Sequence, residues 1–499
     1  MKTVLKVFFF VLVGLHLVLA SWYVLHNDIT FSSEIGRDFF LLGELDQKKI
    51  VLIGPSSSTG LFHGPLWAYV NYPAYLLGNG NPVIVGWYWI FLVICFLLTN
   101  FFLAKKLFDK TTAYLFVLMT SLYMVFHAHG FYNPHGAMLL TPLFFFFFIR
   151  YIETLKVRYL ITHIFIASAI VQFQLAVGIP LLILSFFYIS IKAVRSRKKK
   201  HILIFLLLFI SLGNFLIFDI RHNFLLSHLT LRYLASPGRD HPNYLLLLGD
   251  RLNLMTSGTE ILRLNGGYRN LVAFFLLLFF IFVQIRDKKY KTIYVGFLYF
   301  YVGFFVLSLI NTGPVLYFYL FPLFPFVFLI FSSFVTSRYK KVFIIIFFTM
   351  YVINLQTALT DTQNAKNFIG KDIYSWKFLY RVTSLVYEGK EKEFGYFVYA
   401  PNVTAFEEKY AMQYGQKMHQ KNVYYFTKKP ITYLIIAPPP SNNPYMLDAW
   451  WRINQIKIAK EPDVIVPFEN GYKIEKYVLN DDEIKIPFDP AIDPGLHFR

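Results

Sequence analysis

Long apolar segments separated by short basic loops recur along most of this chain, and they constrain its fold more than any other feature. A helix needs about 20 apolar residues to cross the hydrocarbon core of a bilayer. Hydrophobic residues make up 56% of the 499 residues and mean hydropathy is +0.48, which exceeds what a soluble core requires. We therefore predict a polytopic α-helical membrane protein with about eleven transmembrane helices, at 4–25, 82–104, 111–128, 135–152, 158–174, 176–194, 201–219, 269–286, 290–311, 315–336 and 342–357.

Basic residues give the chain a formal net charge of +19, yet we expect no nucleic-acid partner, because they fall in short runs on every second loop. Such runs hold a loop on the cytoplasmic side. We expect an inner-membrane protein with a cytoplasmic N-terminus, whose first apolar segment is an uncleaved helix rather than a signal peptide. This parity requires residues 64–78 to form a helix at the membrane interface. The basic clusters are Lys105/Lys106/Lys110, Arg150/Lys156/Arg158, Arg195 to Lys200, Arg286/Lys288/Lys289/Lys291 and Arg338/Lys340/Lys341.

The same parity places three large pieces on the outer face: a first loop at about 26–81, a second loop at about 220–268, and the C-terminal part. Residues 1–357 would form the transmembrane domain and residues 358–499 an extracytoplasmic domain. The latter contains short strand-like runs at 396–400, 431–436 and 464–466 between turns rich in Pro and Asn, which is typical of a small α/β domain. The single Cys95 rules out a disulfide within the chain.

Acidic and basic side chains are dense directly after the first apolar segment. Asp28 lies at the expected lipid–water boundary, and a helix over residues 30–43 would place Glu34, Arg37 and Asp38 on one face, at i, i+3 and i+4. A solvated helix face with an internal ion pair is the simpler interpretation for Glu34 and Asp38. Asp28 precedes the helix and is the stronger functional candidate.

A Gly-, Pro- and Ser-rich loop at 52–67 follows and contains His63, and the outer loop before the fourth segment contains His129 and His135. A lone His is more often a capping or surface group than a ligand. The three imidazoles lie on outer loops, so they are candidate ligands for a divalent metal.

These outer-loop residues resemble the GT-C membrane glycosyltransferases that use polyprenyl-phosphate sugars, which include bacterial aminoarabinose transferases and protein O-mannosyltransferases. The resemblance covers about residues 1–360. In that family an Asp opens the first outer loop, a Glu-Ile-x-Arg-like stretch follows, and a second amphipathic helix has a Phe-Glu-Lys-Pro-Pro-Leu-like entry. The matching residues are Asp28, Glu34-Ile35-Gly36-Arg37, Gly43, Phe62-His63-Gly64-Pro65-Leu66 and Leu76-Leu77-Gly78.

Three positions depart from the family pattern. Ile29 replaces the usual second acid, His63-Gly64 replaces Glu-Lys, and Asn133 lies near the place where the family commonly has another Asp. A divalent cation could still be held by neutral imidazoles and a carboxylate, with His63, His129 and His135 as the candidate imidazoles.

The resemblance implies a sugar transfer from a polyprenyl-phosphate donor, with a hexose, mannose-like or pentose sugar, to a lipid, glycan or protein acceptor at the outer face. Asp28 matches the family's base and would accept the acceptor hydroxyl proton in an inverting displacement, with Glu34 and Asp38 as the next candidates. Arginine suits the leaving phosphate because its planar fork pairs two oxygens. The candidates are Arg37, Arg221, Arg232 and Arg239.

Other functions remain open. A transporter or lipid flippase would fit about eleven spans, although ionisable residues are nearly absent inside the segments. A surface-polysaccharide polymerase or ligase would also use lipid-linked sugars. A scaffold that has lost activity would explain Ile29 and Asn133.

Overall fold

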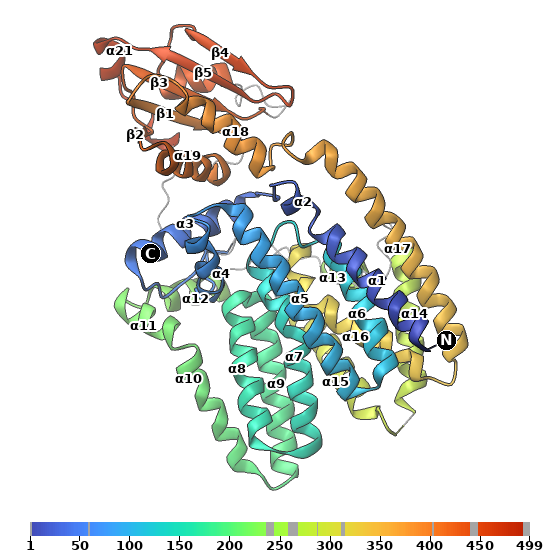
Figure 1. Ribbon diagram of the computed structural model, residues 1–499. Helices are drawn as coiled ribbons and strands as arrows, with labels where there is room; N and C mark the ends of the chain where they lie inside the picture. The colour runs from blue at the N-terminus through green and yellow to red at the C-terminus, as the bar shows by residue number, and fades with distance from the viewer. Residues whose placement is uncertain are drawn as a thin grey trace. The chain divides into compact units, whose positions relative to one another are not determined.

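The computed structural model describes residues 2–57, 60–235, 244–257, 268–286, 288–310, 315–401, 404–439 and 448–492. The chain forms two compact units. The first comprises residues 1–21, 48–71 and 88–362, and the second comprises residues 22–47, 72–87 and 363–499. Figure 1 labels the helices and strands of both units.

The regular elements among the described residues of the first unit are helices. Its elements, in chain order, are α1 (Lys2–Ala20), most of α5 (Pro82–Leu107), α6 (Lys110–Val125), α7 (Asn133–Thr154), α8 (Val157–Phe173), α9 (Leu175–Arg195), η1 (Lys199–Leu207), α10 (Leu208–Ser211), α11 (Gly213–Arg221), α12 (Leu225–Ala235), α13 (Tyr244–Ser257), α14 (Tyr268–Ile285), α15 (Lys291–Ser308), η2 (Tyr317–Leu323), α16 (Phe324–Ser333), η3 (Phe334–Thr336) and most of α17 (Lys340–Phe368).

The apolar segments predicted to cross the membrane are helical over most of their described residues, although 201–219 and 315–336 each consist of three consecutive helical pieces. Six helical stretches among the described residues are long and apolar enough to cross a bilayer, and a seventh is possible if the stretch from Lys199 to Arg221, bent by 50° after Ser211, counts as one span. Several other apolar helices are shorter, including Val157–Phe173. The protein is thus a multi-pass membrane protein, and the exact number of crossings stays a prediction.

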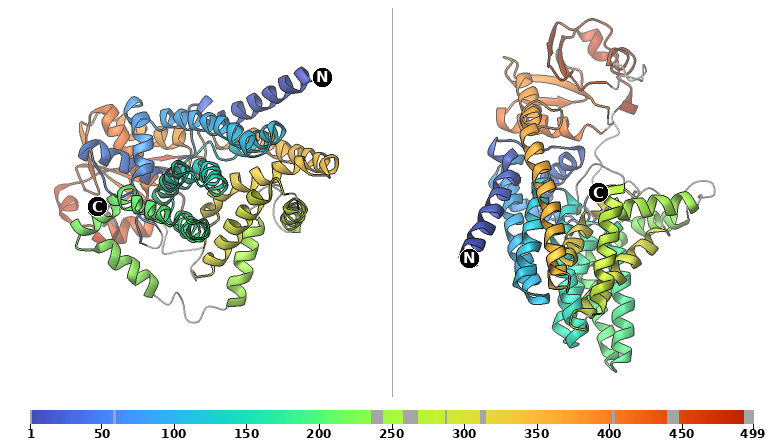
Figure 2. Two further views of the ribbon diagram at one scale, coloured as in Figure 1. Left: turned by 90° about the horizontal axis from the view of Figure 1, so that it is seen from below. Right: turned by 90° about the vertical axis from the view of Figure 1, so that its right-hand side faces the viewer.

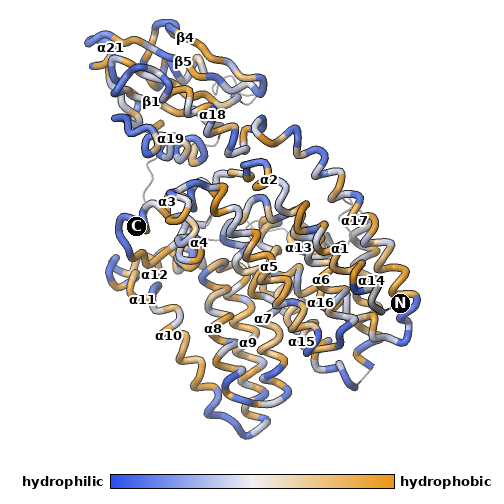
Figure 3. The backbone as a smooth tube through the Cα atoms, in the orientation of Figure 1, coloured by the Kyte–Doolittle hydropathy of each residue, from blue (hydrophilic) through white to orange (hydrophobic). Residues whose placement is uncertain are grey.

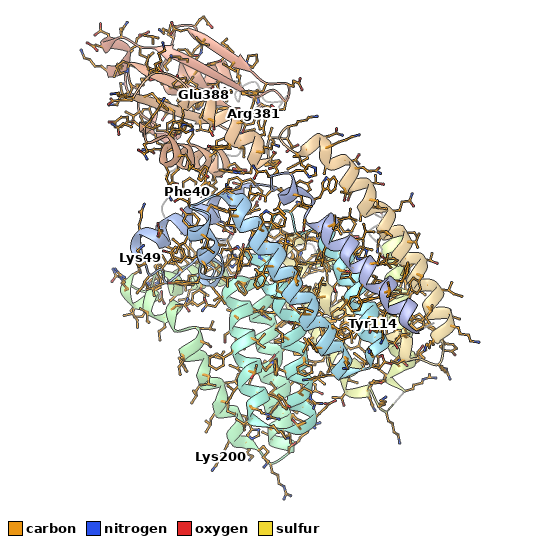
Figure 4. All side chains as sticks on the ribbon, in the orientation of Figure 1. Phe40, Lys49, Tyr114, Lys200, Arg381 and Glu388 are labelled. Carbon is orange, nitrogen blue, oxygen red and sulfur yellow. The ribbon has the colours of Figure 1, made fainter. Side chains whose placement is uncertain are left out.

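Helices α7, α8 and α9 lie side by side and run in alternate directions (Figures 1 and 2). Most of their length is coloured as hydrophobic in Figure 3, and the turns at the lower end are hydrophilic. The chain turns at Leu155 and again after Arg195, and the turn that carries Lys200 marks the tip of this bundle (Figure 4). Two of the basic clusters predicted to face the cytoplasm, Arg150/Lys156/Arg158 and Arg195 to Lys200, therefore lie at one end of this bundle, while α7 and α9 begin at the other.

The second unit combines helices from the first outer loop with a sheet from the C-terminal part. Its helices are α2 (Trp22–Leu25), α3 (Ser33–Lys48), part of α4 (Leu66–Leu77), α18 (Trp376–Tyr387), α19 (Phe406–His419), α20 (Asp448–Trp450), η5 (Trp451–Ile456), α21 (Asp481–Lys485) and η6 (Pro490–Ile492). The helix predicted over 30–43 is α3, and the one predicted over 64–78 is α4; the placement of α4 at a membrane surface stays a prediction.

The sheet has five strands in the order β2-β1-β3-β5-β4. Its strands are β1 (Glu393–Tyr399), β2 (Asn422–Tyr425), β3 (Ile431–Ile436), β4 (Val464–Pro467) and β5 (Lys473–Val478). The first three are parallel, and β5 and β4 complete the sheet in antiparallel pairing. Three of these strands contain the runs predicted at 396–400, 431–436 and 464–466. One face of the sheet packs a core that includes Phe397, Leu434, Trp451 and Tyr477.

Candidate functional site

A short break between α8 and α9 organises the polar chemistry of the first unit. Gln174 interrupts the helices with an extended backbone (φ −149°, ψ 101°), after which α9 starts at Leu175. The Asn133 side-chain amide, in the first turn of α7, donates to the Phe173 carbonyl at 2.9 Å and to Gln174 Oε1 at 3.2 Å. The start of α7, the end of α8 and the start of α9 therefore meet at this junction.

The His135 imidazole, two residues after Asn133, caps the N-terminus of α7. Its Nδ1 accepts a hydrogen bond from the Tyr132 backbone N–H at 3.2 Å, which satisfies one of the unpaired donors of the first turn. The ring stacks on Phe131 with centroids 4.7 Å apart and planes 8° apart, and the His127 ring lies 5.6 Å away. His135 is 1% exposed. The aromatic stacking and the bond to Tyr132 fix its orientation.

The loop that carries His63 docks on the same end of α8. Gly54 and His63 pair through their backbones, and the Gly64 N–H donates to the Gln172 carbonyl at 2.8 Å. A Cβ on residue 64 would lie 1.9 Å from Gln172 Oε1, so only Gly fits there. Gln172 Nε2 is held in turn by the Ser211 carbonyl at 3.0 Å and by Asn214 Oδ1 at 2.8 Å. The replacement of a family Lys by Gly64 is thus a packing requirement.

The metal predicted at His63, His129 and His135 does not fit this geometry. Among the described residues, no group of three or more His, Cys, Asp or Glu side chains could hold a metal ion. His135 Nδ1 accepts from a backbone N–H, so the proton of the neutral ring lies on Nε2. Ligation through Nε2 would move that proton to Nδ1, where it would face the Tyr132 N–H. Metal dependence stays a sequence-based prediction, and no chemical step is derived from it.

The arginines predicted to bind phosphate lie in different places. Arg221, at the end of α11, and Arg232, on α12, are exposed. Arg37 lies on α3 in the second unit, with its guanidinium 3.4 Å from Asp38. Arg239 lies outside the described residues. The structure therefore brings none of these together as a described cluster.

Sequence analysis missed one of the arginines that the fold buries. Arg251, on α13, is 4% exposed, and its Nε donates to the Ser308 carbonyl at 3.3 Å. Burial lowers its pKa. A guanidinium carries five N–H donors in a planar fork. Its position within an apolar helical run (Tyr244-Leu-Leu-Leu-Leu-Gly-Asp-Arg251) was the available signal, because a charge in such a run needs a partner.

Asp28 occupies the centre of a hydrogen-bond cluster in the second unit. Its side chain is 0% exposed, and its carboxylate accepts from Ile29 N at 2.9 Å, Gly370 N at 3.1 Å, Lys377 N at 3.0 Å and Ser375 Oγ at 2.5 Å. Lys377 is in the first turn of α18, so Asp28 satisfies a helix N–H from a distant part of the chain.

We call the cluster of Asp28, Gly370, Ser375 and Lys377 the Asp28 clasp. Backbone hydrogen bonds lie on both sides of it. Thr30 and Ser375 form an antiparallel bridge, flanked by bonds from Phe31 N to the Tyr374 carbonyl and from Trp376 N to the Ile29 carbonyl. Burial raises the pKa of the Asp28 carboxyl, and the four hydrogen bonds oppose that rise. The clasp fastens the first outer loop to the start of α18.

The two fallback carboxylates follow on α3. Glu34 is half-buried and accepts from the Ser32 hydroxyl at 2.8 Å, while Asp38 is 8% exposed and faces Arg37. The sequence predicted the shared helix, and the structure pairs Arg37 with Asp38. Their catalytic roles stay predictions.

The chain is similar to known proteins in structure. No protein-family model and no curated protein sequence matches the chain. Solved structures that do match include ArnT from Cupriavidus metallidurans bound to undecaprenyl phosphate, with a TM-score of 0.61 and 11% identity, and the same protein in the apo state, with a TM-score of 0.60 and 10% identity. Each alignment covers 95% of this chain and 98% of the ArnT chain. The chain therefore has the fold of ArnT, a GT-C aminoarabinose transferase, as its resemblance to that group predicted.

Proposed function

We propose that this protein is a membrane glycosyltransferase that takes a sugar from a polyprenyl-phosphate donor and transfers it to an acceptor at the outer face of the inner membrane. The observation that carries the proposal is the likeness to ArnT along 95% of the chain, in a structure that holds undecaprenyl phosphate. The polar junction of α7, α8 and α9 supports it, because it lies at the end of the bundle away from the basic loops. The donor sugar would be a hexose or a pentose, and the acceptor a lipid, glycan or protein.

The reaction would be a direct displacement. The acceptor oxygen forms a bond to the anomeric carbon, the bond from that carbon to the phosphate oxygen breaks, and the phosphate leaves with the bonding electrons. A base takes the acceptor's hydroxyl proton, and the anomeric centre inverts. Arg251 and the exposed Arg221 and Arg232 are the described cations of the first unit that we propose for the negative charge that develops on the phosphate.

Asp28 stays the sequence-based candidate for the base. An acceptor hydroxyl could reach this carboxylate only after the surrounding chain moved, because Asp28 is 0% exposed and accepts hydrogen bonds from four donors of the chain. The Asp28→Asn variant separates the two roles. If it folds and inserts but does not transfer sugar, the base assignment gains support; if it transfers at the wild-type rate, Glu34 and Asp38 become the candidates.

The direct test uses purified protein in lipid nanodiscs with a panel of undecaprenyl-phosphate sugars. We expect one donor to be consumed, with release of undecaprenyl phosphate, once the acceptor is supplied as an extract of the cell envelope. Arg251→Met should lower that turnover by at least about tenfold, since a charged hydrogen bond is worth about 1.5–3 kcal/mol. Arg150→Met is the matched control, because Arg150 pairs with Glu153 at the opposite end of α7. Failure of every donor would refute the proposal.

A further inference from the structure

One end of the α7–α9 bundle carries more basic residues than the orientation of its helices requires. Residues 150–158 and 192–200, which we call the basic tip, contain nine basic residues and one acid, Glu153, so their formal charge is +8. Small clusters of Lys and Arg are enough to keep a loop on one side of a membrane. The other basic clusters have formal charges of only +2 or +3; they lie at 105–110, 286–291 and 338–341. The excess charge indicates a further role for the basic tip.

The two segments of the basic tip lie together in the fold. The Tyr151 hydroxyl, near the end of α7, and His201 Nδ1, in η1, are hydrogen-bonded at 3.0 Å. Helix η1 also packs on both α8 and α9. Within the first segment, the guanidinium carbons of Arg150 and Arg158 lie 5.9 and 4.9 Å from the centre of the Tyr159 ring. The basic tip is therefore one surface built from two turns.

The second turn holds its charges on a defined backbone. Arg195, Arg197 and Lys198 to Lys200 are exposed. The Arg197 N–H donates to the Val194 carbonyl at 3.1 Å. The Lys198 N–H donates to the Ala193 carbonyl at 2.8 Å, which completes a Schellman turn at the end of α9. Arg197 has a φ of 57°, a left-handed conformation that favours Gly. The Arg197 side chain is thus present against the local preference of the backbone.

Exposed apolar side chains adjoin the basic tip on three helices. Val157 on α8 lies between Lys156 and Arg158 and is 39% exposed, Val194 on α9 is 47% exposed, and Leu203 on η1 is 63% exposed. The aliphatic stems of Lys and Arg can extend along such a surface while their charged ends reach water. Basic and apolar side chains are interleaved in this way where a protein meets the boundary between hydrocarbon and lipid headgroups. This margin favours a lipid over a soluble acidic partner.

We propose that the basic tip binds the phosphate groups of anionic phospholipids in the leaflet that it faces. A guanidinium pairs two phosphate oxygens at once, and each ammonium adds a point charge. The negative surface potential of anionic lipids attracts basic residues that lie next to a membrane helix. The inference goes beyond the proposed function and does not depend on it, because the basic tip lies at the opposite end of α7 from Asn133.

Native mass spectrometry of the full chain, purified in detergent, measures lipid binding directly. The probes are phosphatidylglycerol, which is anionic, and phosphatidylcholine, which has a phosphate but no net charge. We expect phosphatidylglycerol to bind at least about tenfold more tightly, with a preference that falls as the salt concentration rises. Equal binding of the two lipids would overturn the proposal. A short DNA duplex that displaces phosphatidylglycerol at physiological ionic strength would overturn it too, since the basic tip would then be a surface for soluble polyanions.

Arg197→Gly separates lipid binding from folding. Gly suits the left-handed φ, so the melting temperature should stay the same or rise. The loss of one cation should reduce the preference for phosphatidylglycerol by about two- to fivefold. An unchanged preference, or a reduced preference that appears only with a lower melting temperature, would contradict the proposal.

Two triple variants that remove equal charge then locate the surface. Lys198→Gln/Lys199→Gln/Lys200→Gln should reduce the preference by about tenfold or more. Arg338→Gln/Lys340→Gln/Lys341→Gln is the matched control, because these three residues are also exposed but lie outside the basic tip. The proposal fails if the first triple variant keeps the wild-type preference, or if the control loses as much.

Discussion

Removing the Asp28 carboxylate should loosen the second unit, and the size of the effect follows from its hydrogen bonds. In Asp28→Ala, the N–H groups of Ile29 and Lys377 and the Ser375 hydroxyl lose their acceptor, while Gly370 N keeps a bond of 2.9 Å to Ser375 Oγ. A buried donor left unpaired costs about 1–3 kcal/mol. Three donors, some of which will find water, give an expected loss of about 3–4 kcal/mol.

The effect should be local and should depend on Ser375. That residue caps α18 by accepting from Phe378 N at 3.1 Å, so Ser375→Ala alone should cost about 1–2 kcal/mol. Because Asp28 and Ser375 share a hydrogen bond, the double variant should lose less stability than the sum of the two single variants. Additive losses would contradict the clasp as a connected unit.

Hydrogen–deuterium exchange of the purified protein measures this directly, with thermal unfolding in detergent beside it. Peptides that cover residues 28–31 and 370–378 should exchange faster in Asp28→Ala, while peptides of α7 and α8 should not. Asp109→Ala is the matched control, because Asp109 also caps a helix with its carboxylate but accepts only from Thr112 N. The reasoning is refuted if Asp28→Ala unfolds no earlier than Asp109→Ala and the two peptides keep their protection.

Three further changes test the packing of each unit. Gly64→Ala should lower thermal stability, since its Cβ would lie 1.9 Å from Gln172 Oε1; an unchanged melting temperature would contradict the observed close approach. Asn133→Asp should destabilise the junction by about 1–3 kcal/mol, because a carboxylate would face the Phe173 carbonyl that the amide now donates to, and detergent unfolding curves measure it. Burial lowers the pKa of Lys428 to about 8, so unfolding the sheet takes up a proton between about pH 8 and 10.5 and stability should rise with pH there; Lys428→Met should abolish that rise in a pH series of melts.

The transmembrane helices could be predicted because hydrophobic length is a local property of the sequence. Each apolar segment needs to satisfy its own backbone in lipid, so a helix is the only solution available to it. The strand-like runs at 431–436 and 464–466 were found for a similar reason, since short β-branched runs between turns have few alternatives. The number of membrane crossings was harder to predict, because the bend of 50° after Ser211 depends on side-chain packing and not on composition.

The candidate site was predicted less completely, because its geometry depends on contacts between distant segments. The sequence singled out Asp28, but its partners Gly370, Ser375 and Lys377 are more than 340 residues away. The sequence did not indicate a role for Gln174, because a Gln between two apolar runs is common. Its position becomes distinctive only through its extended backbone, which interrupts the helices. The sequence singled out His135 as a candidate metal ligand. The hydrogen bond from the Tyr132 N–H to its Nδ1 is unfavourable for that role.

The departures from the family pattern bear on whether the protein is an enzyme or a scaffold. A catalytic acid that has been lost through decay would leave its former neighbours without partners. Asn133 instead uses both amide hydrogens on acceptors that a carboxylate could not serve, and Ile29, which is 0% exposed, binds the clasp through its N–H and its carbonyl. These residues are integrated into the surrounding structure. Replacements that satisfy their own hydrogen bonds are expected where the fold has adapted to them, so Ile29 and Asn133 do not by themselves indicate a decayed scaffold.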